Sequence, residues 1–251
     1  MSFGRDSIPP PRLRTMRPMS PAALAGFVRL ITVKCTPDVF NPWTDRDPLY
    51  DGRLNGPAAR RARLCAHLSV SAAQILIGEA SGYQGGHISG IPFTSERLLM
   101  SGMVPRVSCA GRRLSARHIP WSEPSATVVW STLQALGIAA TTILWNAFPW
   151  HPHRAGNLQS NRTPTRAERT QGLAALAALL RASPGARLFA VGRHAQLALQ
   201  TIGCDSASPD GASAGAVVLR HPSMGGASEF REGLRRALRG PAARGRAGCR
   251  R

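Results

Sequence analysis

The sequence predicts an α/β fold: a single three-layer αβα domain in which helices cover both faces of a central four-stranded parallel sheet. Three observations support this prediction. Four short apolar runs are typical of buried strands, helical patterns separate them, and each run leads into a polar segment. The expected strands are Gln74–Ile77, Thr142–Trp145, Leu188–Val191 and Ala216–Leu219.

The other elements follow in chain order. Residues 21–34 predict a short helix, because the opening proline suits a first turn, and residues 36–56 predict a loop held to the body by its aromatic side chains. Residues 57–71 predict a helix, since Leu64 and Leu68 lie at i, i+4 spacing. Further helices are expected at Thr94–Ser101, Ala126–Leu136, Thr165–Ala182, Ala195–Ile202 and Glu229–Leu238.

The domain is expected to span residues 21–240, between a basic arm rich in Pro and Arg (1–20) and a basic, disordered tail (241–251). The hydrophobic fraction of 43% is sufficient for a core. No apolar run is long enough to span a membrane, and the N-terminus lacks the apolar core of a secretory signal. These features predict a cytoplasmic protein and, in a bacterium, an activity associated with the nucleoid.

The formal charge of +19 indicates a polyanionic partner, because a basic surface gains affinity by neutralising phosphates and releasing counterions. A genome rich in G and C favours arginine codons, but that bias explains less well why so few acidic residues balance the charge. The five cysteines contain no C-x-x-C pair, so we expect reduced thiols and no metal or other cofactor.

Polar segments follow all four predicted strands, at residues 78–96, 146–165, 192–195 and 220–226. The carboxyl ends of parallel strands meet at one edge of a sheet, and ligands of such folds bind outside that edge. The four segments are therefore expected to converge on one site.

The order of these segments resembles that of the uracil-DNA glycosylase superfamily, over about residues 74–238. The first match is Gly78–Gly82 (GEASG), which leads to Gly90–Glu96 (GIPFTSE). Asn146 then follows at a strand end, and the last match is Arg220–Gly226 (RHPSMGG). The sequence departs from the best-known branch, because Ala80 and Gly82 stand where that branch has Asp and Tyr. The cysteines of the iron–sulfur branches are also missing.

The resemblance implies a role for each segment. Phe93 would stack on a flipped uracil, Asn146 would read its O4 and N3–H edge, and His221 would support the uracil anion as it leaves. Glu79 is the first candidate for the carboxylate that stabilises the sugar cation and orients the attacking water. The expected uracil-binding set also includes Gly78, Ala80 and Tyr83.

Two further residues are alternative catalytic candidates. Glu96 is a second carboxylate in the first segment, although it also suits the first turn of a helix capped by Thr94. His87, or another loop histidine, would be the group that captures an abasic sugar covalently.

The resemblance also implies the DNA contacts. The turn after His221 would wedge into the helix and fill the space of the flipped nucleotide, and arginines would bind the backbone. A helix that starts after Thr163 or Thr165 presents an N-terminus suited to a phosphate. The expected DNA-binding residues are Ser223, Met224, Gly225, Arg154, Arg162 and Arg220.

The function that the resemblance implies is a monofunctional uracil-DNA glycosylase in base excision repair, acting as a monomer on DNA that contains uracil or abasic sites. Lys34 is the only lysine of the chain, and arginine cannot supply the deprotonated amine that Schiff-base chemistry needs. Hydrolysis by water is therefore expected. The alternative is a non-catalytic protein that binds uracil or abasic sites in the same pocket.

Overall fold

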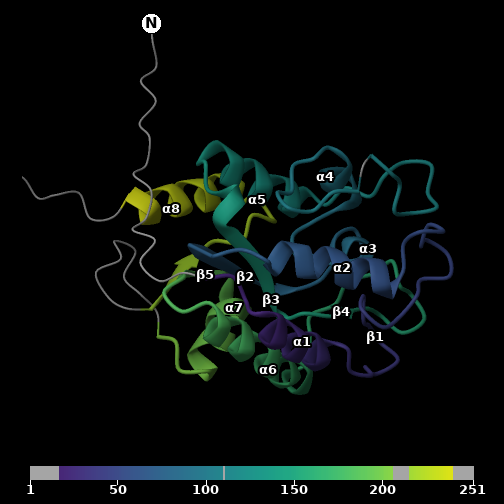
Figure 1. Ribbon diagram of the computed structural model, residues 1–251, viewed down its shortest axis with the longest axis horizontal. Helices are drawn as coiled ribbons and strands as arrows, with labels where there is room; N and C mark the ends of the chain where they lie inside the picture. The colour runs from purple at the N-terminus through teal and green to yellow at the C-terminus, as the bar shows by residue number, and fades with distance from the viewer. Residues whose placement is uncertain (1–16, 110, 206–214, 240–251) are drawn as a thin grey trace, which may run out of the picture.

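The computed structural model describes residues 17–109, 111–205 and 215–239. It is an α/β domain with a four-stranded parallel sheet in the strand order β3-β2-β5-β6 (Figure 1). The strands are β2 (Gln74–Ala80), β3 (Thr142–Phe148), β5 (Arg187–Val191) and β6 (Ala216–Leu219). The predicted fold class is confirmed. Residues 1–16, most of the predicted arm, and the predicted tail lie outside the described residues.

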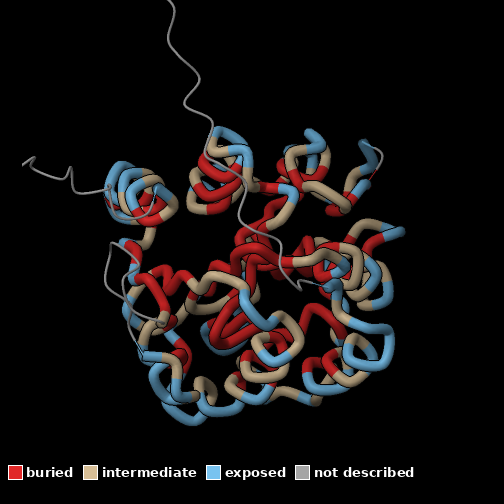
Figure 2. Tube along the Cα trace, turned by 60° about the vertical axis from the view of Figure 1, so that its left-hand side comes forward, coloured by how far each residue is buried: buried red, intermediate tan, exposed pale blue. Residues whose placement is uncertain are grey.

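Helices cover both faces of the sheet. On one face lie α1 (Pro21–Ile31), α6 (Arg166–Ala182) and α7 (Arg193–Thr201), and on the other lie α5 (Pro124–Ala135) and α8 (Ala227–Arg239) (Figure 1). Each face has its own apolar cluster, because side chains alternate between the two faces along a strand. The sheet between them is buried along almost its whole length (Figure 2).

Helix α2 (Pro57–Leu68) lies beside the open edge of β3. The Nε2 atom of His67 accepts a hydrogen bond of 2.9 Å from the backbone N–H of Leu144, which would otherwise lack a partner at that edge. Burial, together with the charge of Arg106, lowers the pKa of His67 to about 3, so the ring is a neutral acceptor.

The predicted loop 36–56 contains one element that the sequence pattern missed. Strand β1 (Val39–Phe40) pairs antiparallel with β4 (His151–Pro152), far along the chain. The aromatic side chains of this loop hold it to the body, as predicted, since Trp43 is fully buried and donates a hydrogen bond to the carbonyl oxygen of Gly90. The remaining elements are α3 (Gly86–Ser89), α4 (Glu96–Met100) and the 3-10 turn Ala139–Thr141.

Helix starts follow local chemistry. Pro21 opens α1 after Ser20, whose hydroxyl accepts a hydrogen bond from the N–H of Ala23. Thr165 caps α6, and Glu168 completes a capping box by accepting from the N–H of Thr165. This carboxylate occupies the helix N-terminus that the sequence suggested for a phosphate.

Candidate active site

An open cleft of about 960 Å³ lies at the carboxyl ends of the strands, where the polar segments meet. The segments after β2, β3 and β6 contribute to it, as predicted, but no residue of the fourth predicted segment, 192–195, lines it. Its lining residues are Glu79, Ala80, Ser81, Gly82, Phe93, Glu123, Ser125, Asn146, Arg154, Asn161, Arg162, Thr163, Pro164, His221, Ser223 and Met224.

Gly78, Phe93 and Asn146 meet at the base of the cleft. A Cβ atom at position 78 would overlap the Phe93 ring and the Oδ1 atom of Asn146, so only glycine allows this approach. Phe93 adopts a φ of 50°, a costly backbone conformation for an aromatic residue, and its side chain is almost completely buried. The Nδ2 atom of Asn146 donates to the hydroxyl of Ser81 over 3.3 Å, which fixes the orientation of the amide.

His221 lies in the turn after β6, with its ring 5.9 Å from that of Phe93. The backbone N–H of Ser223 donates to Nδ1 of His221 over 3.2 Å, and the Ser223 hydroxyl lies 2.7 Å from the same atom. Burial lowers the pKa of His221, and the charge of Arg220 lowers it further, so the ring is neutral. A neutral ring whose Nδ1 accepts carries its proton on Nε2.

Met224 stands at the tip of this turn. Its side chain is 91% exposed, and its φ of 50° is followed by a φ of 80° at Gly225, which turns the chain sharply. Gly226 fits only as glycine, because a Cβ atom there would overlap the carbonyl oxygen of His221. Arg220 braces the turn by donating to the carbonyl oxygen of Met224 over 3.5 Å. The result is an apolar, protruding side chain on a rigid turn beside the cleft.

Glu79 lies at the end of β2 and lines the cleft beside Ala80. Its Oε1 atom lies 2.6 Å from Nδ1 of His194, at the start of α7. The sequence marked the segment 192–195 as part of the site but did not single out His194. The sequence pattern could not identify His194, because its contact with Glu79 depends on the pairing of β2 with β5 in the sheet.

Glu123 is a cleft residue that the sequence reasoning missed. It precedes α5, and its Oε2 atom is enclosed without a hydrogen-bond partner among the described residues. That oxygen occupies the space in which a side chain at Gly85 would stand. Burial raises the pKa of Glu123 to about 7. No sequence signal marks it, because its partner glycine lies in a distant loop.

Glu96, the second candidate carboxylate, lies outside the cleft. It is completely buried, and its oxygens accept hydrogen bonds from the backbone N–H groups of Leu114, Ser115 and Trp121 and from the side chain of Arg113. Burial alone would raise the pKa of Glu96, but these hydrogen bonds hold it below its ordinary value. Glu96 therefore anchors the segment 113–121, and Ser95, rather than the expected Thr94, precedes the helix.

His87, the other alternative, is also buried away from the cleft. Its Nδ1 atom lies 2.8 Å from Nδ1 of His151, and its Nε2 atom lies 2.9 Å from the Asp47 carboxylate. Its ring stacks on Phe40 at 3.8 Å. Burial lowers the pKa of His151 to about 3, with a further contribution from His87. These contacts join three chain segments and leave no open face for covalent chemistry.

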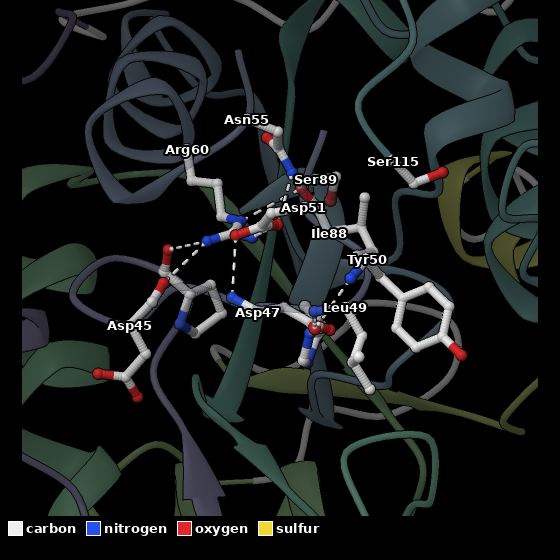
Figure 3. A network of polar contacts seen from close by, with 12 residues as sticks. Asp45, Asp47, Leu49, Tyr50, Asp51, Asn55, Arg60, Ile88, Ser89 and Ser115 are labelled. Atoms are coloured by element: carbon white, nitrogen blue, oxygen red, sulfur yellow. Dashed lines mark hydrogen bonds and ion pairs between the residues drawn. The ribbon is translucent and has the colours of Figure 1, made fainter. Parts of the chain in front are cut away.

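A second polar network connects the segment 36–56 with α2 and α3 (Figure 3). Arg60 pairs with Asp51 at complete burial and donates to the carbonyl oxygen of Ile88, and Asn55 bridges the same two groups. Buried charges are tolerated only when they are paired and hydrogen-bonded, which this arrangement provides. The network holds α3, and with it the approach of the chain to Phe93.

Of the remaining predicted residues, only some are placed to contact a ligand in the cleft. Arg154 is exposed at the cleft, whereas Arg162 is engaged: both its terminal nitrogens bond to the Glu168 carboxylate, at 2.7 and 2.6 Å. Arg162 thus braces the chain before α6. The Tyr83 ring packs edge-on against Trp121 at 5.5 Å and is not part of the cleft lining among the described residues.

The described residues hold neither a metal-binding cluster nor a membrane-spanning helix. Residues 17–109, 111–205 and 215–239 contain no group of three or more His, Cys, Asp or Glu side chains placed to hold a metal ion. Over the same ranges, no helix has the length and apolar character needed to cross a membrane.

Comparison with known proteins agrees with this geometry. The family model of the uracil DNA glycosylase superfamily matches residues 66–238, which include the whole sheet and all the cleft segments described above. No curated protein matches the chain. A similar solved structure is the crystal structure of wild-type Pedobacter heparinus SMUG2, with a TM-score of 0.55 at 14% identity. The similarity covers 86% of this chain and 95% of that one. The chain belongs to the uracil DNA glycosylase superfamily.

Proposed function

We propose that this protein is a monofunctional uracil-DNA glycosylase that flips uracil out of DNA and hydrolyses its N-glycosidic bond with water. The observation that carries the proposal is the convergence of Glu79, Phe93, Asn146 and His221 on one cleft. Each supplies a different requirement of base excision: a carboxylate, a stacking surface, a base-reading amide and a donor for the leaving base.

The reaction follows from these positions. The C1′–N1 bond breaks, and its electron pair leaves with the base as a uracil anion. His221, neutral and protonated on Nε2, donates a hydrogen bond to the base oxygen on which negative charge develops. A water molecule adds to the sugar cation at C1′, and Glu79 accepts its proton. The product is an abasic site.

Base selection rests on Phe93 and Asn146. The fixed backbone of Phe93 and the absence of a side chain at Gly78 leave one face of the ring for stacking. The Asn146 amide, oriented by Ser81, offers a donor and an acceptor to the O4 and N3–H of uracil. Cytosine presents the opposite pattern there, so it would leave buried polar groups unpaired.

DNA engagement rests on the exposed Met224 and on arginine. Met224 fills the gap left by the flipped nucleotide, because it is apolar, unbranched and held on a rigid turn. Arg154 is free to contact phosphate at the rim of the cleft. Lys34, the only lysine, is not part of the cleft lining, which supports attack by water over a Schiff base.

The test is alkali-revealed cleavage of a labelled oligonucleotide that carries one uracil, with the cytosine oligonucleotide as the substrate control. Wild type should cleave only the uracil strand, and His221→Ala should lose roughly 100-fold or more in rate with unchanged thermal stability. His118→Ala is the matched control, since His118 is exposed and outside the cleft. Tight retention of uracil or abasic DNA without cleavage by wild type would instead identify a non-catalytic binding protein.

A further inference from the structure

Glu79 and His194 come from neighbouring strands of the sheet. Glu79 lies at the end of β2, and His194 is the second residue of α7, which follows β5 directly. Strands β2 and β5 pair in parallel, so their carboxyl ends lie side by side and bring the two side chains together. The side chains are 36% and 32% exposed, and their closest atoms, Oε1 and Nδ1, are 2.6 Å apart.

The contact with His194 involves only Oε1 of the Glu79 carboxylate. Oε1 of Glu79 is enclosed and has no hydrogen-bond partner among the described residues, but Nδ1 of His194 lies 2.6 Å from it, within ion-pair distance. The Glu79 side chain as a whole is partly exposed and lines the cleft. A glutamate side chain has three rotatable bonds, so a fixed partner on one oxygen restricts where the other points.

His194 is itself held in place. It stands in the first turn of α7, whose neighbouring Ala195 and Ala198 are buried against the sheet. Arg166 and Arg169 of α6 line a small hollow together with His194. His194 therefore contacts Glu79 and also lines a hollow with two arginines of α6.

We propose that His194 is a positioning residue for the reaction: its ring, with Nδ1 2.6 Å from Oε1 of Glu79, fixes that oxygen so that Oε2 faces the attacking water. The proposal rests on the proposed function, in which Glu79 accepts the proton of that water. Nδ1 of histidine can donate when the ring carries a proton on that atom. Misplacing a catalytic group by about 1 Å can cost on the order of 100-fold in rate.

Two substitutions of His194 test the proposal, and they differ in whether an N–H group remains near the position of Nδ1. His194→Leu removes it, whereas the side-chain amide of His194→Asn places an N–H near the same point without a ring. Single-turnover excision of uracil should fall roughly 10- to 100-fold in His194→Leu and should recover to within about threefold of wild type in His194→Asn. The affinity for uracil DNA, measured by filter binding, should change less than about threefold.

A double-mutant cycle with Glu79→Gln separates this inference from the proposed function. If His194 acts through Glu79, His194→Leu should slow excision by less than about twofold in the Glu79→Gln background. Equal rate losses in both backgrounds, or a loss confined to DNA affinity, would overturn the positioning role and indicate a phosphate contact. Full activity of Glu79→Gln would also overturn it, and absence of excision by wild type would instead refute the proposed function. His118→Leu is the matched control and should behave as wild type.

Discussion

Replacement of Glu123 by glutamine should change the pH dependence of stability in a defined direction. Oε2 of Glu123 is enclosed against Gly85 without a hydrogen-bond partner among the described residues, so the ionised form is poorly solvated. Burial raises the pKa of this carboxyl from its ordinary value of 4.5 to about 7. Glutamine has nearly the same shape and does not ionise.

The magnitude follows from the two pKa values. In the folded protein Glu123 binds its proton more tightly than in the unfolded chain, so stability increases as the pH falls from about 7 to 4.5. Below 4.5 the carboxyl is protonated in both states and the effect vanishes. Above about 7 the folded state carries the full penalty, which is about 3 kcal/mol because one pKa unit is worth about 1.4 kcal/mol.

The assay is urea unfolding of wild type and Glu123→Gln at a series of pH values from roughly 4.5 to 8.5. The difference between the two unfolding free energies should shift by up to about 3 kcal/mol in favour of glutamine as the pH rises across this range. Glu232→Gln is the control, since Glu232 is exposed and pairs with Arg235 on the surface of α8. A difference that stays constant with pH would refute the account of Glu123 as an enclosed acid with a raised pKa.

Four further predictions follow from the same structure. Gly78→Ala should reduce uracil excision by roughly 100-fold at a stability cost of about 1–3 kcal/mol, because the added Cβ would overlap the aromatic ring in the cleft; excision within threefold of wild type would contradict this. Met224→Ala should leave the melting temperature unchanged and slow excision from duplex DNA more than from single strands, which parallel rate measurements would check. Arg154→Ala should lower DNA affinity and reduce the slope of log K against log[salt] by about 1. Arg162→Ala should mainly lower stability, because Arg162 pairs with Glu168. Salt titrations of DNA binding and urea unfolding would distinguish the two variants. Replacing His67 by glutamine should reduce the loss of stability between pH 6.5 and about 3, because protonation favours the unfolded chain there; an unchanged acid unfolding curve would argue against this.

Much of the fold could be predicted because it depends on local pattern. Apolar runs bounded by polar segments identified all four sheet strands, and prolines and caps marked the helix starts to within a few residues. The short pair β1 and β4 was missed, since two residues per strand carry no periodic signal. The strand order β3-β2-β5-β6 depends on which strands pair, and the sequence pattern does not specify that pairing. This order decides which side chains meet at the carboxyl ends of the strands.

The candidate site shows the same division. Glu79, Phe93, Asn146 and His221 could be named in advance, because each stands in a short motif at a strand end, and the structure brings all four to one cleft. Glu96 could be named only as an alternative that also suited a helix start, since burial against a distant loop decides its role. The same holds for Glu123 and His194, because Gly85 and Glu79 lie far from them along the chain. Arg162 was assigned to DNA, although its partner Glu168 lies only six residues further on.

By itself the sequence determined the α/β class, the strand-end segments and the superfamily that their order resembles. Only the tertiary structure decided that Glu79 meets His194, that Glu123 is an enclosed acid, and that Arg162 pairs with Glu168. The physical reason is that strand and helix patterns are set by neighbours in sequence. Burial, ion pairing and shifted pKa values are set by neighbours in space, which the chain order alone does not specify.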